Sequence, residues 1–198
     1  MERLKIVRLA IGASAIFLGI FGLFLSVPIL AGDLLLKPGN GTLYRIQERK
    51  TVTPEGIGRL IDSRQRALEW WNSEHVWADL GLAHLVHSAW VDKPQARSEL
   101  AAAHEALKQS LNLAPANPYV WTRLAYVNYL LQGVSGEMVN ALRMALITGP
   151  NEQFIAHVRL ELGLLAWGSL TGGDRKLIER QAVRAWTFNP DRALEITR

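Results

Sequence analysis

The sequence predicts an all-α protein, with one N-terminal transmembrane helix followed by a solenoid of helical hairpins. Three observations predict this fold. No charged residue occurs from Leu9 to Gly32, a run of 24 residues. From Pro54 onward apolar residues recur at helical spacing, and no alternating strand pattern interrupts them. Helices end in prolines at Pro115, Pro150 and Pro190, which are 35 and 40 residues apart, and such a period is typical of stacked helical hairpins.

The uncharged run is long enough to cross a bilayer. At about 1.5 Å per residue it spans roughly 36 Å, and a hydrocarbon core is about 30 Å thick. A cleaved signal peptide normally has an apolar core of about 7 to 15 residues that ends in small residues. This run is longer and ends in Ile29, Leu30 and Ala31. The sequence therefore predicts an uncleaved transmembrane helix over residues 9–32.

The flanking charges predict the orientation of this helix. Arg3, Lys5 and Arg8 lie in the short N-terminal segment, whereas Lys37 is the only basic residue within the first dozen positions after the run. Basic residues favour the cytoplasmic side of a membrane. Residues 1–8 are thus predicted to be a cytoplasmic tail. The C-terminal domain is predicted to be periplasmic, on the outer side of a bacterial-type inner (plasma) membrane.

Small residues form one stripe along the predicted transmembrane helix. Their spacings of three, four, three and four place them on a single face, where a second helix could approach closely. The partner helix could belong to another copy of the chain, giving a homo-oligomer, or to a larger integral membrane protein. The stripe consists of Gly12, Ala15, Gly19, Gly22 and Ser26.

Residues 33–53 contain the turn formers Lys37 to Gly41 and are predicted to be a linker or a membrane-proximal cap. Residues 54–198 are predicted to form the helical domain. Glycine, proline and asparagine positions divide it, and Asn117, Ser135 and Asp174 are predicted to cap the helices that follow them. The predicted helices cover residues 54–71, 74–91, 94–113, 118–132, 136–148, 151–170 and 174–188.

The paired helices resemble the tetratricopeptide repeat (TPR) over residues 74–190. The first copy consists of Trp77, Leu80, Gly81 and His84, followed by Ala103, Leu107, Ser110 and Pro115. The second consists of Trp121, Leu124 and Ala125, followed by Met138, Leu142, Ala145 and Pro150. The third consists of Leu162 and Gly163, followed by Ile178, Ala182, Ala185 and Pro190. About ten extra residues separate the halves of the first copy. In each copy a small residue, such as Gly81, lets the neighbouring helix approach.

The resemblance implies a concave surface, lined by the first helix of each pair, that holds a peptide or a segment of a partner protein. Aromatic and apolar residues at helical spacing are the candidates for this surface, because tyrosine and tryptophan offer large contact areas. The alternative is that they fill space between hairpins as core residues. The candidate groove consists of Tyr119, Thr122, Tyr126, Tyr129, Leu160, Leu164 and Trp167.

Composition argues against several other function classes. The chain has no cysteine and a net charge of +4, and no basic cluster with interleaved aromatics predicts nucleic-acid binding. His84 and His87 lack the further ligands of a metal motif, so no metal or cofactor is predicted. No nucleophile elbow, phosphate-binding loop or acid and base pair predicts an enzyme. The tryptophans are interpreted as packing at the first hairpin junction: Trp70, Trp71, Trp77 and Trp90.

These observations favour a membrane-anchored scaffold, an accessory subunit that recruits or positions partner proteins of a cell-envelope complex. Proteins of this build occur in secretion machinery and in polysaccharide synthesis and export. A second hypothesis is a glycan- or peptide-binding module that uses the aromatic groove. An enzyme without a recognisable motif is the third.

Overall fold

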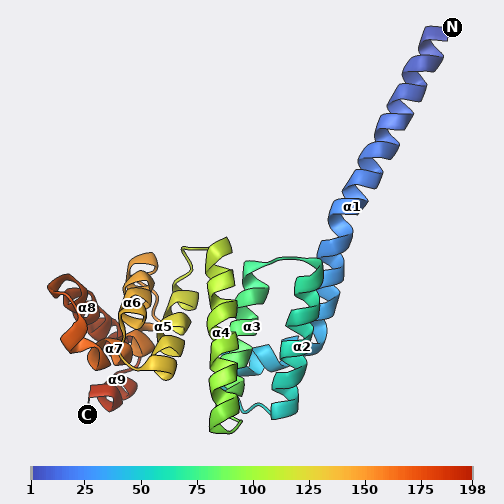
Figure 1. Cartoon of the computed structure of the whole chain (residues 1–198). Helices are drawn as coiled ribbons and strands as arrows, with labels where there is room; N and C mark the ends of the chain where they lie inside the picture. The colour runs from blue at the N-terminus through green and yellow to red at the C-terminus, as the bar shows by residue number, and fades with distance from the viewer. Residues whose placement is uncertain (1, 198) are drawn as a thin grey trace.

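The computed structural model describes the backbone of residues 2–197 and the side chains of residues 11–196. Within these residues the chain forms nine α-helices and no strand, which confirms the predicted all-α class. Figure 1 shows α1 projecting from one end of an array formed by the other helices. The helices are α1 (Glu2–Gln47), α2 (Pro54–Trp70), α3 (Glu74–His87), α4 (Lys93–Leu113), α5 (Pro118–Gln132), α6 (Gly136–Thr148), α7 (Ala156–Leu165), α8 (Gly172–Phe188) and α9 (Pro190–Thr197).

Polar side chains begin several helices as the sequence predicts. Asn117 accepts hydrogen bonds from the amides of Tyr119 and Val120, and Ser135 accepts one from the amide of Met138. The prediction that Asp174 caps α8 is wrong, because the N-cap of this helix is Thr171. Asp174 lies in the first turn, where its carboxylate accepts from Thr171 and completes a capping box.

Helix α1 runs without a break through the segment that was predicted to be a linker. The expected turn at Lys37 to Gly41 is wrong, since this segment is helical up to Gln47 despite Pro38. The physical reason is close packing against α2. A Cβ atom on Gly39 would clash with Ser63 Oγ and would lie 2.9 Å from Leu60 Cα. Tertiary contact therefore overrides a local preference for a turn.

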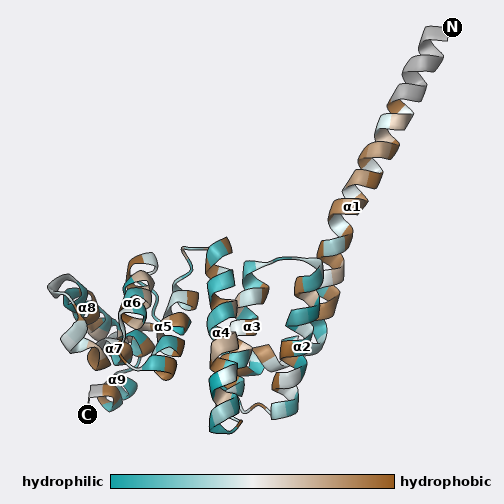
Figure 2. Ribbon diagram, in the orientation of Figure 1, coloured by the Kyte–Doolittle hydropathy of each residue, from teal (hydrophilic) through white to brown (hydrophobic). Residues whose placement is uncertain are grey.

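The N-terminal half of α1 has no cover within the described chain. Its large apolar side chains are exposed from Ile11 to Leu30, including Phe17 at 68% and Phe24 at 75%. Figure 2 shows this apolar segment projecting beyond the array. Among the described residues, α1 is the one helix long and apolar enough to cross a membrane.

The remaining helices pack mainly against their neighbours in sequence. The most extensive contacts join α1 with α2, α3 with α4, and α5 with α6. Two glycines allow close contact within the α3–α4 pair and within the α7–α8 pair, as their positions in the sequence predict. A Cβ on Gly81 would lie 2.7 Å from Leu107 Cγ, and one on Gly163 would lie 2.7 Å from Ile178 Cγ1. Both partner residues belong to the buried core between the helices.

The C-terminal third differs most from the predicted elements. The helix expected over residues 151–170 begins only at Ala156 and ends at Leu165. Residues before it form a turn, because the Arg159 guanidinium donates to the Gly149 carbonyl at 2.7 Å and Gln181 Nε2 donates to the Pro150 carbonyl at 3.2 Å. After α8, Pro190 begins the unpredicted helix α9, where a proline at the first position costs no hydrogen bond.

The close contact at Gly39 predicts that a larger residue at this position destabilises the protein. We expect Gly39→Ala to lower the free energy of unfolding by about 1 to 3 kcal/mol, because the new methyl group overpacks the contact between α1 and α2. Gly41→Ala is the matched control, since a Cβ at Gly41 meets nothing within 4 Å. In an exposed helix that change raises stability by up to about 1 kcal/mol.

The measurement is unfolding of the full chain in detergent micelles, followed by tryptophan fluorescence. Equal effects of the two substitutions would contradict the tight contact at Gly39.

Candidate functional site

The predicted small-residue stripe lies on the exposed half of α1. A Cβ placed on Gly12, Gly19 or Gly22 would meet nothing within 4 Å, so these glycines are not required by packing within the chain. Ser26 Oγ donates to the Gly22 carbonyl at 2.7 Å, which satisfies this hydroxyl within the helix. Gly12, Ala15, Gly19, Gly22 and Ser26 thus form a smooth, exposed surface.

Two predicted groove residues are part of the interior instead. Thr122 is 3% exposed and Leu160 is 2% exposed. The Thr122 hydroxyl donates to the Pro118 carbonyl and accepts from Arg159 Nε at 3.3 Å. Helical spacing places Thr122 on the same face as the tyrosines, but tertiary packing decides that Thr122 faces α7.

Two further predicted residues have partners outside any groove. Tyr119 donates its hydroxyl hydrogen to Glu152 at 2.7 Å, and burial together with this carboxylate raises the pKa of Tyr119. Trp167 lies on a short 3₁₀ helix after α7, where the Arg175 guanidinium stacks 5.4 Å from the ring centre. These contacts hold the turn after α6 and the start of α8, respectively.

The remaining predicted residues line one hollow of about 630 Å³. Tyr126 and Tyr129 reach it from α5, and Leu164 reaches it from α7. Side chains of α7 and α9 complete the lining. They are Glu161, Leu165, Arg192, Glu195 and Ile196.

A second hollow, of about 560 Å³, adjoins the first through Tyr126, which lines both. Its lining is mostly apolar and comes from α3, α4, α5 and the turn between α3 and α4. Trp90 and Leu130 in this lining are 49% and 42% exposed. We call the two hollows together the Tyr126 groove. Besides the residues named above, the second hollow is lined by Leu85, Val86, Ser88, Ala89, Ala96 and Leu100.

Sequence reasoning missed much of the Tyr126 groove. A signal was present for Leu130, which lies four residues after Tyr126 and therefore on the same helix face. Trp70 and Trp90 were interpreted as packing at the first hairpin junction, and this is wrong because they are 53% and 49% exposed. Ile196 could not be predicted as a groove residue, since no helix was predicted after Pro190.

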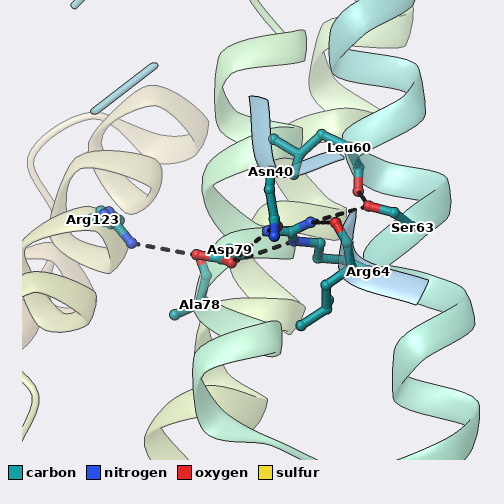
Figure 3. A network of polar contacts seen from close by, with 8 residues as sticks. Asn40, Leu60, Ser63, Arg64, Ala78, Asp79 and Arg123 are labelled. Atoms are coloured by element: carbon teal, nitrogen blue, oxygen red, sulfur yellow. Dashed lines mark hydrogen bonds and ion pairs between the residues drawn. The ribbon is translucent and has the colours of Figure 1, made fainter. Parts of the chain in front are cut away.

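A buried cation joins α1 to the array. The Arg64 side chain is 1% exposed and lies where α1, α2 and α3 meet (Figure 3). Its guanidinium donates to the Leu36 carbonyl at 2.9 Å, to Asn40 Oδ1 at 2.8 Å and to Asp79 Oδ2 at 3.1 Å. The first two acceptors belong to α1 and the third to α3, so one side chain binds three helices together.

Asp79 continues this network toward α5. Burial raises the pKa of Asp79, and the nearby Arg64 acts in the opposite direction by favouring the carboxylate. Arg123 on α5 also favours the charged form of Asp79, and it donates to the Ala78 carbonyl at 3.5 Å (Figure 3). The two cations therefore offset part of the desolvation of one carboxylate, whose pKa stays raised.

Two histidines of α3 lie beside Glu99 of α4. His84 Nδ1 makes a hydrogen bond of 2.6 Å with Glu99 Oε2, which joins α3 to α4, and His87 Nδ1 lies 3.1 Å from Glu99 Oε1 without hydrogen-bond geometry. Within the described residues, no group of three histidine, aspartate or glutamate side chains is placed to hold a metal ion.

The hydrogen bonds of Arg64 predict that loss of this side chain destabilises the protein. We expect Arg64→Ala to lower the free energy of unfolding by about 3 kcal/mol, because it leaves Asp79 and two acceptors on α1 without their partner. Arg66→Ala, two residues further along α2 at an exposed position, is the control and should change stability by less than about 0.5 kcal/mol.

Both variants are compared by unfolding of the full chain and by proteolysis at residues 48–53, between α1 and α2. An Arg64→Ala chain with unchanged stability and unchanged cleavage would contradict the bridging role.

Comparison with known proteins gives no assignment for this chain. No protein-family model matches the sequence, and a search of curated proteins finds no match. Among the described residues, the stripe on α1 and the Tyr126 groove are two exposed surfaces that suit a partner.

Proposed function

We propose that this protein is a single-pass, membrane-anchored scaffold that positions a partner protein of a cell-envelope complex. In this proposal the stripe on α1 packs against a membrane helix, and the Tyr126 groove holds a segment of the partner outside the bilayer. The observation that carries the proposal is the exposed apolar lining of the groove.

The chemistry of the groove suits a protein segment. Trp90, Leu130 and Leu165 are between 42% and 49% exposed, so a bound segment would remove large apolar areas from water. Tyr126 lies at the centre and can combine apolar contact with a hydrogen bond through its hydroxyl. Glu161, at the far end, adds a charge that can select among segments.

The packing of the helices supports the proposed tetratricopeptide-like architecture. Gly81 and Gly163 lie at the equivalent small-residue position of the first and third copies, and each contacts the second helix of its own pair closely. The groove includes residues of α3, α5 and α7, the three helices that would line the concave surface of such a stack.

The proposed location follows from α1 and the flanking charges. The uncharged helix would anchor the chain in a bacterial-type inner membrane, with residues 1–8 cytoplasmic and the helical array periplasmic. Assembly, secretion or polysaccharide-export complexes of the envelope are the proposed setting, since they need proteins held at the membrane surface.

The groove is tested by photo-crosslinking in native membranes. A photoreactive amino acid replaces Leu130 in the groove or, as control, Val134, which is also 42% exposed but does not line either hollow. We expect a discrete crosslinked protein from position 130 and none from position 134.

The same band should disappear when Leu165→Glu places a charge at the other end of the groove, because burying an unpaired carboxylate is unfavourable. Equal bands from both positions, or a band that persists with Leu165→Glu, would contradict binding in the groove.

The stripe is tested with Gly19→Leu combined with Gly22→Leu. We expect this double variant to lose the membrane complex, because bulky side chains prevent the close approach of a second helix. The control is Phe17→Leu with Phe24→Leu, on the opposite face of α1. Complexes extracted gently from native membranes are compared by size, and an unchanged complex in the glycine variant would remove the stripe from the proposal.

A glycan or a free peptide is the second candidate ligand. Tyr126 and Tyr129 share their hollow with Glu161, Arg192 and Glu195, an arrangement of aromatic faces and polar groups that suits sugars. Titration of the purified chain with envelope glycans and peptides, followed by tryptophan fluorescence, tests this candidate. Trp90 reports on the groove, and no response across the panel would exclude it.

A further inference from the structure

We propose that the edge of the array nearest the exposed half of α1 contacts the lipid headgroup region, with Trp70 as its principal contact. This inference rests on the proposed membrane anchoring and adds a second membrane contact to it. The array would then lie along the bilayer surface and not extend away from it.

The end of the uncharged run indicates at which depth of the bilayer this edge of the array would lie. Gly32 closes the run and Asp33 is the first charged residue after it. Gly32 also lies against the end of α2, since a Cβ at this position would be 3.5 Å from Trp71 Cβ. The adjacent residues Trp70 and Trp71 are thus at the level where the apolar span would leave the hydrocarbon.

The continuity of α1 holds this edge in place. Helix α1 is unbroken from the exposed segment to Gln47, and the hydrogen bonds of Arg64 join the C-terminal half of α1 to α2 and α3. The array therefore cannot swing freely about a linker. Any membrane that contains residues 9–32 would meet the same side of the array.

Exposed apolar side chains occur on this side. Trp70 is 53% exposed at the end of α2, and Leu113 is 46% exposed at the end of α4. Ser110 Oγ donates to the Glu74 carbonyl at 2.8 Å, which places the end of α4 beside the start of α3. Figure 1 shows the connections after α2 and after α4 on the side from which α1 projects.

Lipid is the occupant that the chemistry favours. Tryptophan is enriched where a protein crosses from hydrocarbon to water, because its ring is apolar and its indole N–H can still be hydrated. Trp70 is a large exposed aromatic at that depth, with no hydrogen bond to its ring nitrogen among those described. Trp90 is 49% exposed but belongs to the turn between α3 and α4, and Figure 1 shows this turn at the opposite edge of the array from the connection after α2.

The absence of cysteine allows single labelling sites. An environment-sensitive fluorophore is attached to Trp70→Cys, to Trp90→Cys as the matched control, and to Phe17→Cys as a reporter of α1. Each full-length chain is reconstituted into phosphatidylcholine and phosphatidylglycerol vesicles that carry a quencher either near the headgroups or near the chain ends. Thermal unfolding of each labelled chain confirms that it is folded.

We expect loss of fluorescence at position 70 with the headgroup-proximal quencher, loss at position 17 with the deep quencher, and no loss at position 90. Quenching at 17 but not at 70 would overturn the lipid contact while leaving the anchor intact. No quenching at 17 would overturn the membrane anchor and, with it, the proposed function. Equal quenching at 70 and 90 would indicate adsorption without a defined edge and would also overturn the inference.

Discussion

The ion pair and hydrogen bonds of Arg64 are the interaction on which the arrangement of this protein depends. A guanidinium buried to 1% exposure is costly unless its donors are satisfied, and here the acceptors come from α1, α2 and α3 together. The acceptors on α1 and α3 are in place only when the three helices are packed. Gly39 lets α1 come close enough to α2 for this, because any side chain at that position would occupy the space of Ser63.

In the proposed function, this junction would let the membrane anchor also set the orientation of the array. A flexible linker after residue 32 would allow the array to take many orientations, whereas a continuous helix allows few. The stripe on α1 and the Tyr126 groove would then face their partners at the same time. Linked contacts of this kind strengthen each other when the geometry permits both. The proposed scaffold function therefore depends on the rigidity of α1 as well as on the two surfaces.

Sequence periodicity predicted the helices well and the groove only in part. Tyr126, Tyr129 and Leu164 lie in one hollow as expected. Thr122 and Leu160 share the spacing of these residues but face the interior. Spacing along a helix shows which residues share a face, but what covers that face depends on neighbouring helices. The partners of Tyr119 and Trp167, Glu152 and Arg175, were likewise beyond the reach of a periodicity argument.

Local sequence signals were enough to predict the helical class, the apolar segment and most helix boundaries, because charge, periodicity and capping act over a few residues. Local signals failed where distant contacts were stronger. Pro38 and Gly39 predicted a turn, and the contact with α2 made them helix. The bridge at Arg64, the exposure of Trp70 and Trp90, and the two hollows that share Tyr126 became visible only in the folded chain. Each of these depends on residues far apart in the chain, whose distances are decided by packing.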